Sequence, residues 1–236
     1  MALAPIQPAP WRSALNSARA HLRAGIFLQA MALILVLAYY HVPPARAFLD
    51  RLLEIRRETG FAFGIVSTAV FGGLLPFLYL RSLGAEAGAG PRYRWPQGFA
   101  LIAFWGYKGF EIDLFYRVLA RIVGEGHDAG TIARKVLIDQ FVYCPAFAVP
   151  LTVGVYRWVD ARFDLVSAVS DWRAPHWYLR RVLPVMISNL GVWVPAVAII
   201  YALPTPLQLP LENLVLCFFT LVLAHQTRGQ AAPSAS

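Results

Sequence analysis

Four ionisable side chains lie within one long apolar stretch of the sequence, residues 98–123. They are Lys108, Glu111, Asp113 and Arg117. A charge at the centre of a membrane helix costs about 2.5–3.5 kcal/mol on insertion scales, so charges found there usually have a partner or a function. Intramembrane ionisable groups often line the pathways of ions, protons or polar substrates. These residues are therefore the first candidates for chemistry.

The spacing of the four charges gives each of them an opposite partner on the same helix. At about 100° per residue, Lys108 and Glu111 share one face, and Asp113 and Arg117 share nearly the opposite face. Two interpretations stay open. The pairs could only lower the cost of inserting the helix, or one pair could face a polar cavity within a bundle.

A further acidic residue, Asp139, lies near the start of the apolar segment 136–158 and is followed by Gln140. Pro145 comes next in the same segment, and a proline removes a helix hydrogen bond and tends to kink the helix. In a membrane bundle, the carbonyls freed in this way can line a cavity. Asp139 therefore either pairs with Lys135, four residues earlier, or contributes to a polar cavity.

These observations define one set of candidates for a pore or polar cavity. The set is Lys108, Glu111, Asp113, Arg117, Asp139 and Gln140. We expect Lys108, Arg117 and Asp139 to line the cavity, with Glu111 and Asp113 as the balancing charges.

The composition of the chain assigns these residues to a membrane protein. Of its 236 residues, 58% are hydrophobic and only 14% are charged, and the mean hydropathy is +0.54. A soluble domain carries about 25% charged residues, so this chain has too few to coat a soluble surface. The net charge of +8 requires no nucleic-acid partner, because basic loops orient membrane helices.

Six apolar segments approach the length of about 20 residues that a membrane-spanning helix needs. They are residues 24–40, 61–80, 98–123, 136–158, 182–203 and 211–224. The third spans only if its charges are tolerated, and the last is short. The sequence therefore predicts an all-α fold, a polytopic helical membrane bundle of about five to six transmembrane segments.

The segments predict a single transmembrane domain over residues 24–226. A basic N-terminal tail (1–23) precedes it and a disordered C-terminal tail (227–236) follows it. The first tail has the composition of a transit peptide, and "ARA" (45–47) resembles a signal-peptidase site, but a retained first span is the better interpretation. If all six segments span, twelve basic residues lie on the side of the N-terminus and eight on the other, which favours cytoplasmic termini.

The sequence offers little for enzyme chemistry. Cys144 and Cys217 lie in apolar runs, which indicates buried free thiols, and no metal-ligand spacing is present. No nucleophile elbow or phosphate-binding glycine loop occurs either. Scattered polar residues share one loop, but a solvated loop explains them better: Asp160, Asp164, Asp171 and His176. We therefore expect no enzyme, no catalytic residue, no metal and no cofactor.

The stretch "FYRVLARIVGEGHDAGTIARKVLIDQFVYCPAF", residues 115–147, carries a further pattern. It combines an aromatic-Tyr-x-x-Leu element, a basic helix start that leads into Asp-Gln, and a later proline, and a looser Trp and Pro element follows in "GVWVPAV". With these features, residues 98–228 resemble the Mpv-seventeen and peroxisomal membrane protein family. The matching positions are Phe115, Tyr116, Leu119, Lys135, Asp139, Gln140, Pro145, Trp193 and Pro195.

The chain also departs from the family pattern. Ala120 stands at the family's aspartate position, one extra residue separates Trp193 from Pro195, and segment 61–80 is additional. The closing helix lacks the family's Trp and Ser, and the first helix lacks its Gly-Asp element. The resemblance therefore implies a divergent, bacterial member of the family.

The resemblance implies an integral membrane pore or channel for small solutes or metabolites. Its partners would be the lipid bilayer and a small solute or ion, and a homo-oligomer stays open. The bacterial inner membrane is favoured, with the mitochondrial inner or peroxisomal membrane if the chain is eukaryotic. A non-transporting membrane scaffold or assembly protein is the alternative, and a membrane-embedded enzyme is a weaker one.

Overall fold

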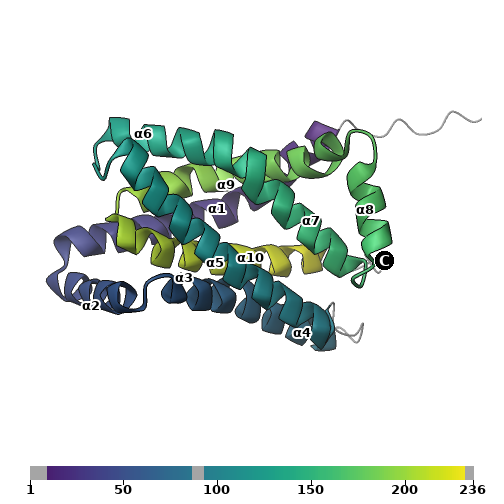
Figure 1. Cartoon of the computed structure of the whole chain (residues 1–236), viewed down its shortest axis with the longest axis horizontal. Coiled ribbons are helices and arrows are strands. Elements are labelled where there is room, and N and C mark those ends of the chain that lie inside the picture. Colours follow the sequence, from purple (N-terminus) through teal and green to yellow (C-terminus); the bar gives the residue numbers. More distant parts are fainter. Residues whose placement is uncertain (1–9, 87–92, 232–236) are drawn as a thin grey trace, which may run out of the picture.

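A computed structural model describes residues 10–86 and 93–231 of the chain (Figure 1). Of the described residues, 90% are helical, and no strand occurs among them. The prediction of an all-α fold is therefore confirmed.

The chain forms ten α-helices and three π-helical segments over the described residues. In chain order they are α1 (Pro10–His41), α2 (Pro43–Thr59), α3 (Phe61–Thr68), η1 (Ala69–Leu74), α4 (Leu75–Glu86), α5 (Trp95–Val123), α6 (Ala129–Ile138), η2 (Asp139–Ala148), α7 (Val149–Asp160), α8 (Leu165–Arg173), η3 (Tyr178–Val182), α9 (Leu183–Tyr201) and α10 (Thr205–Ala231).

The π-helical segments join neighbouring α-helices into longer rods. Segment η1 links α3 to α4, and η2 links α6 to α7. Pro145 lies inside η2, where it has no backbone N–H to donate, so the regular hydrogen-bond ladder cannot continue through it. The irregularity expected around Pro145 is therefore present, in the form of a widened helix.

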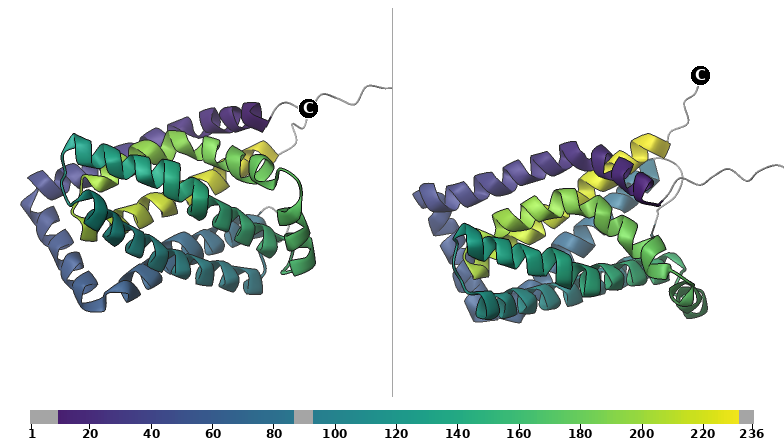
Figure 2. Two further views of the ribbon diagram at one scale, coloured as in Figure 1. Left: turned by 45° about the horizontal axis from the view of Figure 1, so that its top comes forward. Right: turned by 90° about the horizontal axis from the view of Figure 1, so that it is seen from above.

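Helix α10 occupies the centre of the bundle (Figures 1 and 2). It contacts α1, α2, α3, η1, α4, α5 and α9. Buried apolar residues of its first half, Leu207, Leu209, Leu211 and Val215, belong to the largest core cluster. In that cluster they meet residues of α1, α5 and α9, so α10 ties together helices that are distant in the sequence.

The outer surface of the bundle is strongly apolar. Large hydrophobic side chains are exposed on α1, α5 and η2, among them Phe27, Ile34, Phe99, Ile122 and Phe141. Soluble monomers rarely expose extended apolar surfaces. This exterior, with polar groups collected inside, is compatible with insertion into a membrane.

Three helical rods are long and apolar enough to cross a membrane: Phe61–Ser82, Ala129–Asp160 and Tyr178–Tyr201. A fourth span results if Gly25–His41 and Pro43–Thr59, which meet at a bend of 98°, are taken as one broken span. These three or four candidates are fewer than the five to six transmembrane segments predicted from the sequence.

The difference in number has physical reasons. Helix α5 carries five charged side chains, and the apolar part of α1 stops at His41, where the chain turns into the more polar α2. The predicted segment 211–224 lies inside α10 and extends beyond residue 221, where the described side chains end, so this span stays a prediction. Hydropathy along the sequence could not anticipate the sharp bend after α1.

Two helices extend into the predicted tails. Helix α1 begins at Pro10, inside the predicted basic tail 1–23, and α10 continues to Ala231, inside the predicted tail 227–236. Residues 1–9 and 232–236 lie outside the described ranges.

Candidate functional site

Helix α5 carries three of the four predicted charges into the interior of the bundle and holds the fourth at its surface. Lys108, Glu111 and Asp113 are only 3%, 8% and 0% exposed, whereas the Arg117 side chain is 42% exposed. Lys108 Nζ donates to Glu111, and Arg117 donates to Asp113 through Nε at 3.1 Å and Nη2 at 3.2 Å. Both predicted pairs within the helix are therefore present.

The first pair gains a partner from η2. Tyr143 donates its hydroxyl proton to Glu111, and Lys108 Nζ lies 3.5 Å from the Tyr143 oxygen and 5.6 Å from the centre of its ring. Phe115 stacks on the other side of this ring, with the ring centres 4.0 Å apart. Glu111 Oε2, however, has no hydrogen-bond partner among the described residues. Contacts from η2 thus hold the pair in place, but one carboxylate oxygen of Glu111 still lacks a hydrogen bond.

The second pair belongs to a three-residue cluster. Arg56 of α2, itself 4% exposed, donates to the same Asp113 carboxylate that holds Arg117. Its other terminal nitrogen donates to the backbone carbonyl of Pro206, at the start of α10. One carboxylate therefore balances two guanidinium groups. Sequence reasoning missed Arg56, because its partner lies 57 residues away and on another helix.

Asp139 is buried at the junction of α6 and η2. Its carboxylate accepts hydrogen bonds from the Tyr201 hydroxyl at 2.6 Å, the Cys144 thiol at 3.3 Å and the Gln140 amide at 3.3 Å. No ion pair joins it to Lys135 in residues 93–231. The interpretation of Asp139 as a simple helix-end partner of Lys135 is therefore wrong.

The central helix adds polar groups that the sequence analysis did not single out. Tyr116 donates to Glu212. Asn213 accepts a hydrogen bond from the Thr68 hydroxyl at 2.8 Å and donates one to the Ser67 hydroxyl at 2.9 Å. Glu212 and Asn213 are adjacent polar residues at the start of an otherwise apolar segment, and this was the signal available in the sequence.

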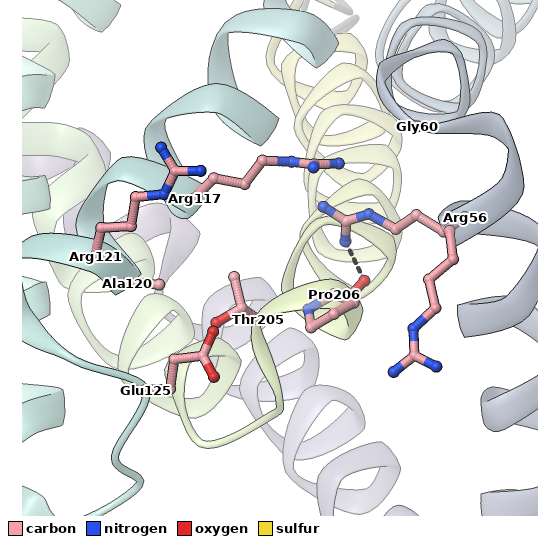
Figure 3. A pocket seen from close by; sticks show the side chains of 9 residues that line it. Arg56, Gly60, Arg117, Ala120, Arg121, Glu125, Thr205 and Pro206 are labelled. Carbon is pink, nitrogen blue, oxygen red and sulfur yellow. Dashed lines mark hydrogen bonds between the residues drawn. The ribbon is translucent and has the colours of Figure 1, made fainter.

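An open pocket of about 560 Å³ lies where α2, the end of α5 and the start of α10 meet (Figure 3). Its lining is Arg56, Arg57, Gly60, Arg117, Ala120, Arg121, Glu125, Thr205 and Pro206. Of the three residues expected to line one cavity, Arg117 lines this pocket. Lys108 and Asp139 pack in buried contacts away from it, so this pocket does not bring the three together.

The positions that match the family pattern are packing positions in the described structure. Tyr116 meets the Tyr201 ring edge-on at 5.6 Å, and Trp193 meets Phe219 at 5.8 Å. The Lys135 ammonium lies 5.9 Å from the centre of the Tyr201 ring. The remaining positions are buried or lie inside helices: Phe115, Leu119, Gln140, Pro145 and Pro195.

The acidic residues predicted to share one loop instead lie at the end of α7 (Asp160), at the N-cap of α8 (Asp164) and inside α8 (Asp171), and each has its own structural contacts. Asp160 accepts from Tyr93 at 3.1 Å, and Asp164 caps the start of α8. Asp171 joins Arg157 at 3.2 Å and Arg181 at 3.3 Å. Burial alone would raise the pKa of Asp171, but these two guanidinium groups lower it overall.

The described residues contain no group of three or more His, Cys, Asp or Glu side chains placed to hold a metal ion. Cys144 and Cys217 are both free thiols, as predicted. Comparisons of the chain with family models, with curated proteins and with solved structures gave no match. The resemblance to the Mpv-seventeen family rests on the quoted residues alone and stays a prediction.

Proposed function

We propose that the protein is an integral membrane protein that lets a small solute or ion pass through its helical bundle. The observation that carries this proposal is the inward position of its ionisable side chains. Lys108, Glu111 and Asp113 all point away from the apolar exterior and are buried. Charged groups in this position inside membrane proteins commonly mark solute or ion pathways.

The partners of these charges support a role beyond insertion. A pair within one helix is enough to lower the cost of placing that helix in a membrane. Here the pairs also recruit Arg56 from α2 and Tyr143 from η2, and a second cluster joins Asp139 to Tyr201 of α9. Such an interior, assembled from several helices, is what a polar pathway requires.

The resemblance to the Mpv-seventeen family supports the same proposal. We propose the bacterial inner membrane as its location, or the mitochondrial inner or peroxisomal membrane for a eukaryotic chain. The pathway would contain Glu111 and Asp139, two buried carboxylates that each contact side chains of a second helical segment. If the protein forms a homo-oligomer, each copy would contain its own pathway.

Planar-bilayer conductance and liposome flux with the purified, reconstituted protein test the proposal. We expect Glu111→Gln and Asp139→Asn to change ion selectivity or conductance, because each removes a charge while keeping a hydrogen-bonding side chain. Arg134→Gln, at an exposed position of α6, is the matched control and should behave as the wild type.

Two outcomes would overturn parts of this proposal. If the folded wild type shows no conductance at any pH or voltage and no flux of any solute in a panel, the pore hypothesis is rejected and the non-transporting scaffold is favoured. Conductance that is the same in Glu111→Gln, Asp139→Asn and the control would show that the pathway runs elsewhere.

A further inference from the structure

The pocket beside α2 and α5 has an unusual excess of positive charge. Four arginines and one glutamate line it. Arg56 and Arg117 share the single carboxylate of Asp113, so this buried cluster keeps a positive charge. Arg57 and Arg121 are exposed and form no ion pair with any residue of the described ranges. An anion in this pocket would relieve repulsion among the four guanidinium groups.

The two inner arginines are held in place before any ligand binds. Asp113 accepts hydrogen bonds from both guanidinium groups, and the Pro206 carbonyl fixes the other end of the Arg56 group. In Figure 3 the guanidinium groups of Arg56 and Arg117 point toward one another across the pocket. Side chains ordered in advance lose little entropy when a ligand binds, which favours affinity.

The guanidinium group selects the chemistry of the ligand. Its planar fork of N–H donors matches the oxygens of a phosphate or carboxylate group. Four arginines exceed what one carboxylate would need, and a doubly charged phosphate group balances them better. Thr205, also in the lining, adds a hydroxyl that can donate to a phosphate oxygen.

The size of the pocket indicates more than a free phosphate ion. Its volume of about 560 Å³ lies in the range of about 300–1,000 Å³ that small-molecule sites occupy. Gly60 belongs to the lining, and a Cβ added there would meet nothing within 4 Å, so the pocket has free space beside this residue. The volume can therefore hold a phosphate group together with part of a larger molecule that carries it.

We propose that this arginine pocket, defined by Arg56, Arg57, Arg117 and Arg121, binds the phosphate group of a small molecule or of an anionic lipid. The phosphate lies on the pocket side of the Arg56 and Arg117 guanidinium groups and accepts from N–H groups that Asp113 and Pro206 leave unused, and Arg57 and Arg121 close over it from the exposed side. This binding does not depend on solute transport, so the site and the proposed pore can fail independently.

Thermal unfolding of the purified chain in neutral detergent micelles, followed by tryptophan fluorescence, tests the site. One arm adds sodium phosphate against sodium chloride at matched ionic strength. The other adds phosphatidic acid against phosphatidylcholine to the micelles. A ligand that binds only the folded protein raises the unfolding temperature. We expect a rise with phosphate if the ligand is soluble, and only with phosphatidic acid if the ligand is a lipid.

Substitution of the outer arginines assigns the effect to the pocket. Arg57→Gln and Arg121→Gln remove exposed charges without breaking an ion pair of the described structure, so both variants should fold. Each should weaken the apparent affinity by about tenfold, the loss expected for one charged hydrogen bond. Arg51→Gln, an exposed arginine on α2 outside the pocket lining, is the matched control.

The proposal is overturned if neither phosphate nor phosphatidic acid stabilises the wild type beyond its matched control. It is equally overturned if the stabilisation is the same in Arg57→Gln, Arg121→Gln and Arg51→Gln, because the anion would then act on the general charge of the surface. Calorimetric titration with whichever of inorganic phosphate and phosphatidic acid stabilises the wild type should give the same order of affinities among the variants.

Discussion

The backbone of Gly64 in α3 lies directly against the backbone of Gly109 in α5. A Cβ added at Gly64 would stand 2.9 Å from the Gly109 carbonyl oxygen and 3.0 Å from a Leu209 methyl group. Two residues without side chains thus let the helices touch, as small residues do at the crossings of membrane helices. The crossing lies one turn from Asp113, so it also sets how closely that carboxylate approaches α2.

Replacing Gly109 with alanine should destabilise the bundle, because its Cβ would collide with the Gly64 carbonyl group. Overpacking of this kind costs about 1–3 kcal/mol, and the helices must separate to relieve it. Gly106→Ala is the matched control, since a Cβ there would meet its nearest neighbour at an ordinary 3.6 Å. Denaturation in mixed micelles should show a loss for Gly109→Ala only. Equal losses would contradict the close crossing.

Replacing one residue of the buried Lys108–Glu111 pair should lower the free energy of unfolding more than replacing both. Lys108→Met leaves the Glu111 carboxylate without its cation, and Glu111→Gln leaves the ammonium without its anion. Loss of one partner of a buried pair typically costs about 3–5 kcal/mol. The double variant should recover much of this loss, which a double-mutant cycle of unfolding free energies would detect. Additive losses would mean that the two groups do not interact.

The two arginines that share Asp113 should differ in their contribution to stability. Arg56 is 4% exposed and also holds the Pro206 carbonyl, whereas the Arg117 side chain is 42% exposed. Arg56→Gln should therefore lower the unfolding free energy by about 3–5 kcal/mol. Arg117→Gln should lower it by about 1 kcal/mol or less, because water screens an exposed pair. The reverse order in denaturation experiments would contradict the assigned burial.

Acid should loosen the start of α8. The Ser167 hydroxyl and the backbone N–H groups of Ser167 and Val166 donate to Asp164, and they hold its pKa below the ordinary 3.8. A lowered pKa means that the stabilisation is complete above 3.8 and is lost as the pH falls through the lower folded-state value. The protection of the α8 amides, which compares their exchange rate with that of an unstructured chain at the same pH, should therefore fall in acid.

Asp164→Asn provides the control for this pH dependence. Asparagine caps a helix about as well as aspartate but carries no titrating group. The variant should retain α8 at neutral pH and lose the acid-dependent part of the exchange. If both proteins respond to acid in the same way, another group controls the stability of α8.

The sequence predicted those contacts of the site that depend on helical periodicity. Spacings of three and four residues were enough to pair Lys108 with Glu111 and Asp113 with Arg117. The same reasoning could not find Arg56, because the Arg56–Asp113 contact depends on how two helices cross. Neighbours in a folded chain that lie far apart in the sequence leave no periodic signal.

Asp139 also shows that local spacing alone does not identify the partner of a buried charge. Lys135 lies one helical turn away and was a reasonable local partner, but the carboxylate instead accepts from Tyr201, 62 residues later in the chain. A hydroxyl from a neighbouring helix can satisfy a buried carboxylate as well as a local cation can. Local spacing therefore predicts which contacts are open to a residue, and tertiary packing decides which of them forms.

The central position of α10 has a consequence for biogenesis. Ribosomes make α10 after every helix that it contacts, so the groups that depend on it must wait for its arrival. Until then Tyr116 lacks Glu212, Thr68 lacks Asn213, and the second donor group of Arg56 lacks the Pro206 carbonyl. The earlier helices are therefore made with these polar groups temporarily unmatched. Docking of α10 is thus the step that closes the bundle, and a ribosome stalled before it would expose an incomplete interior to quality control.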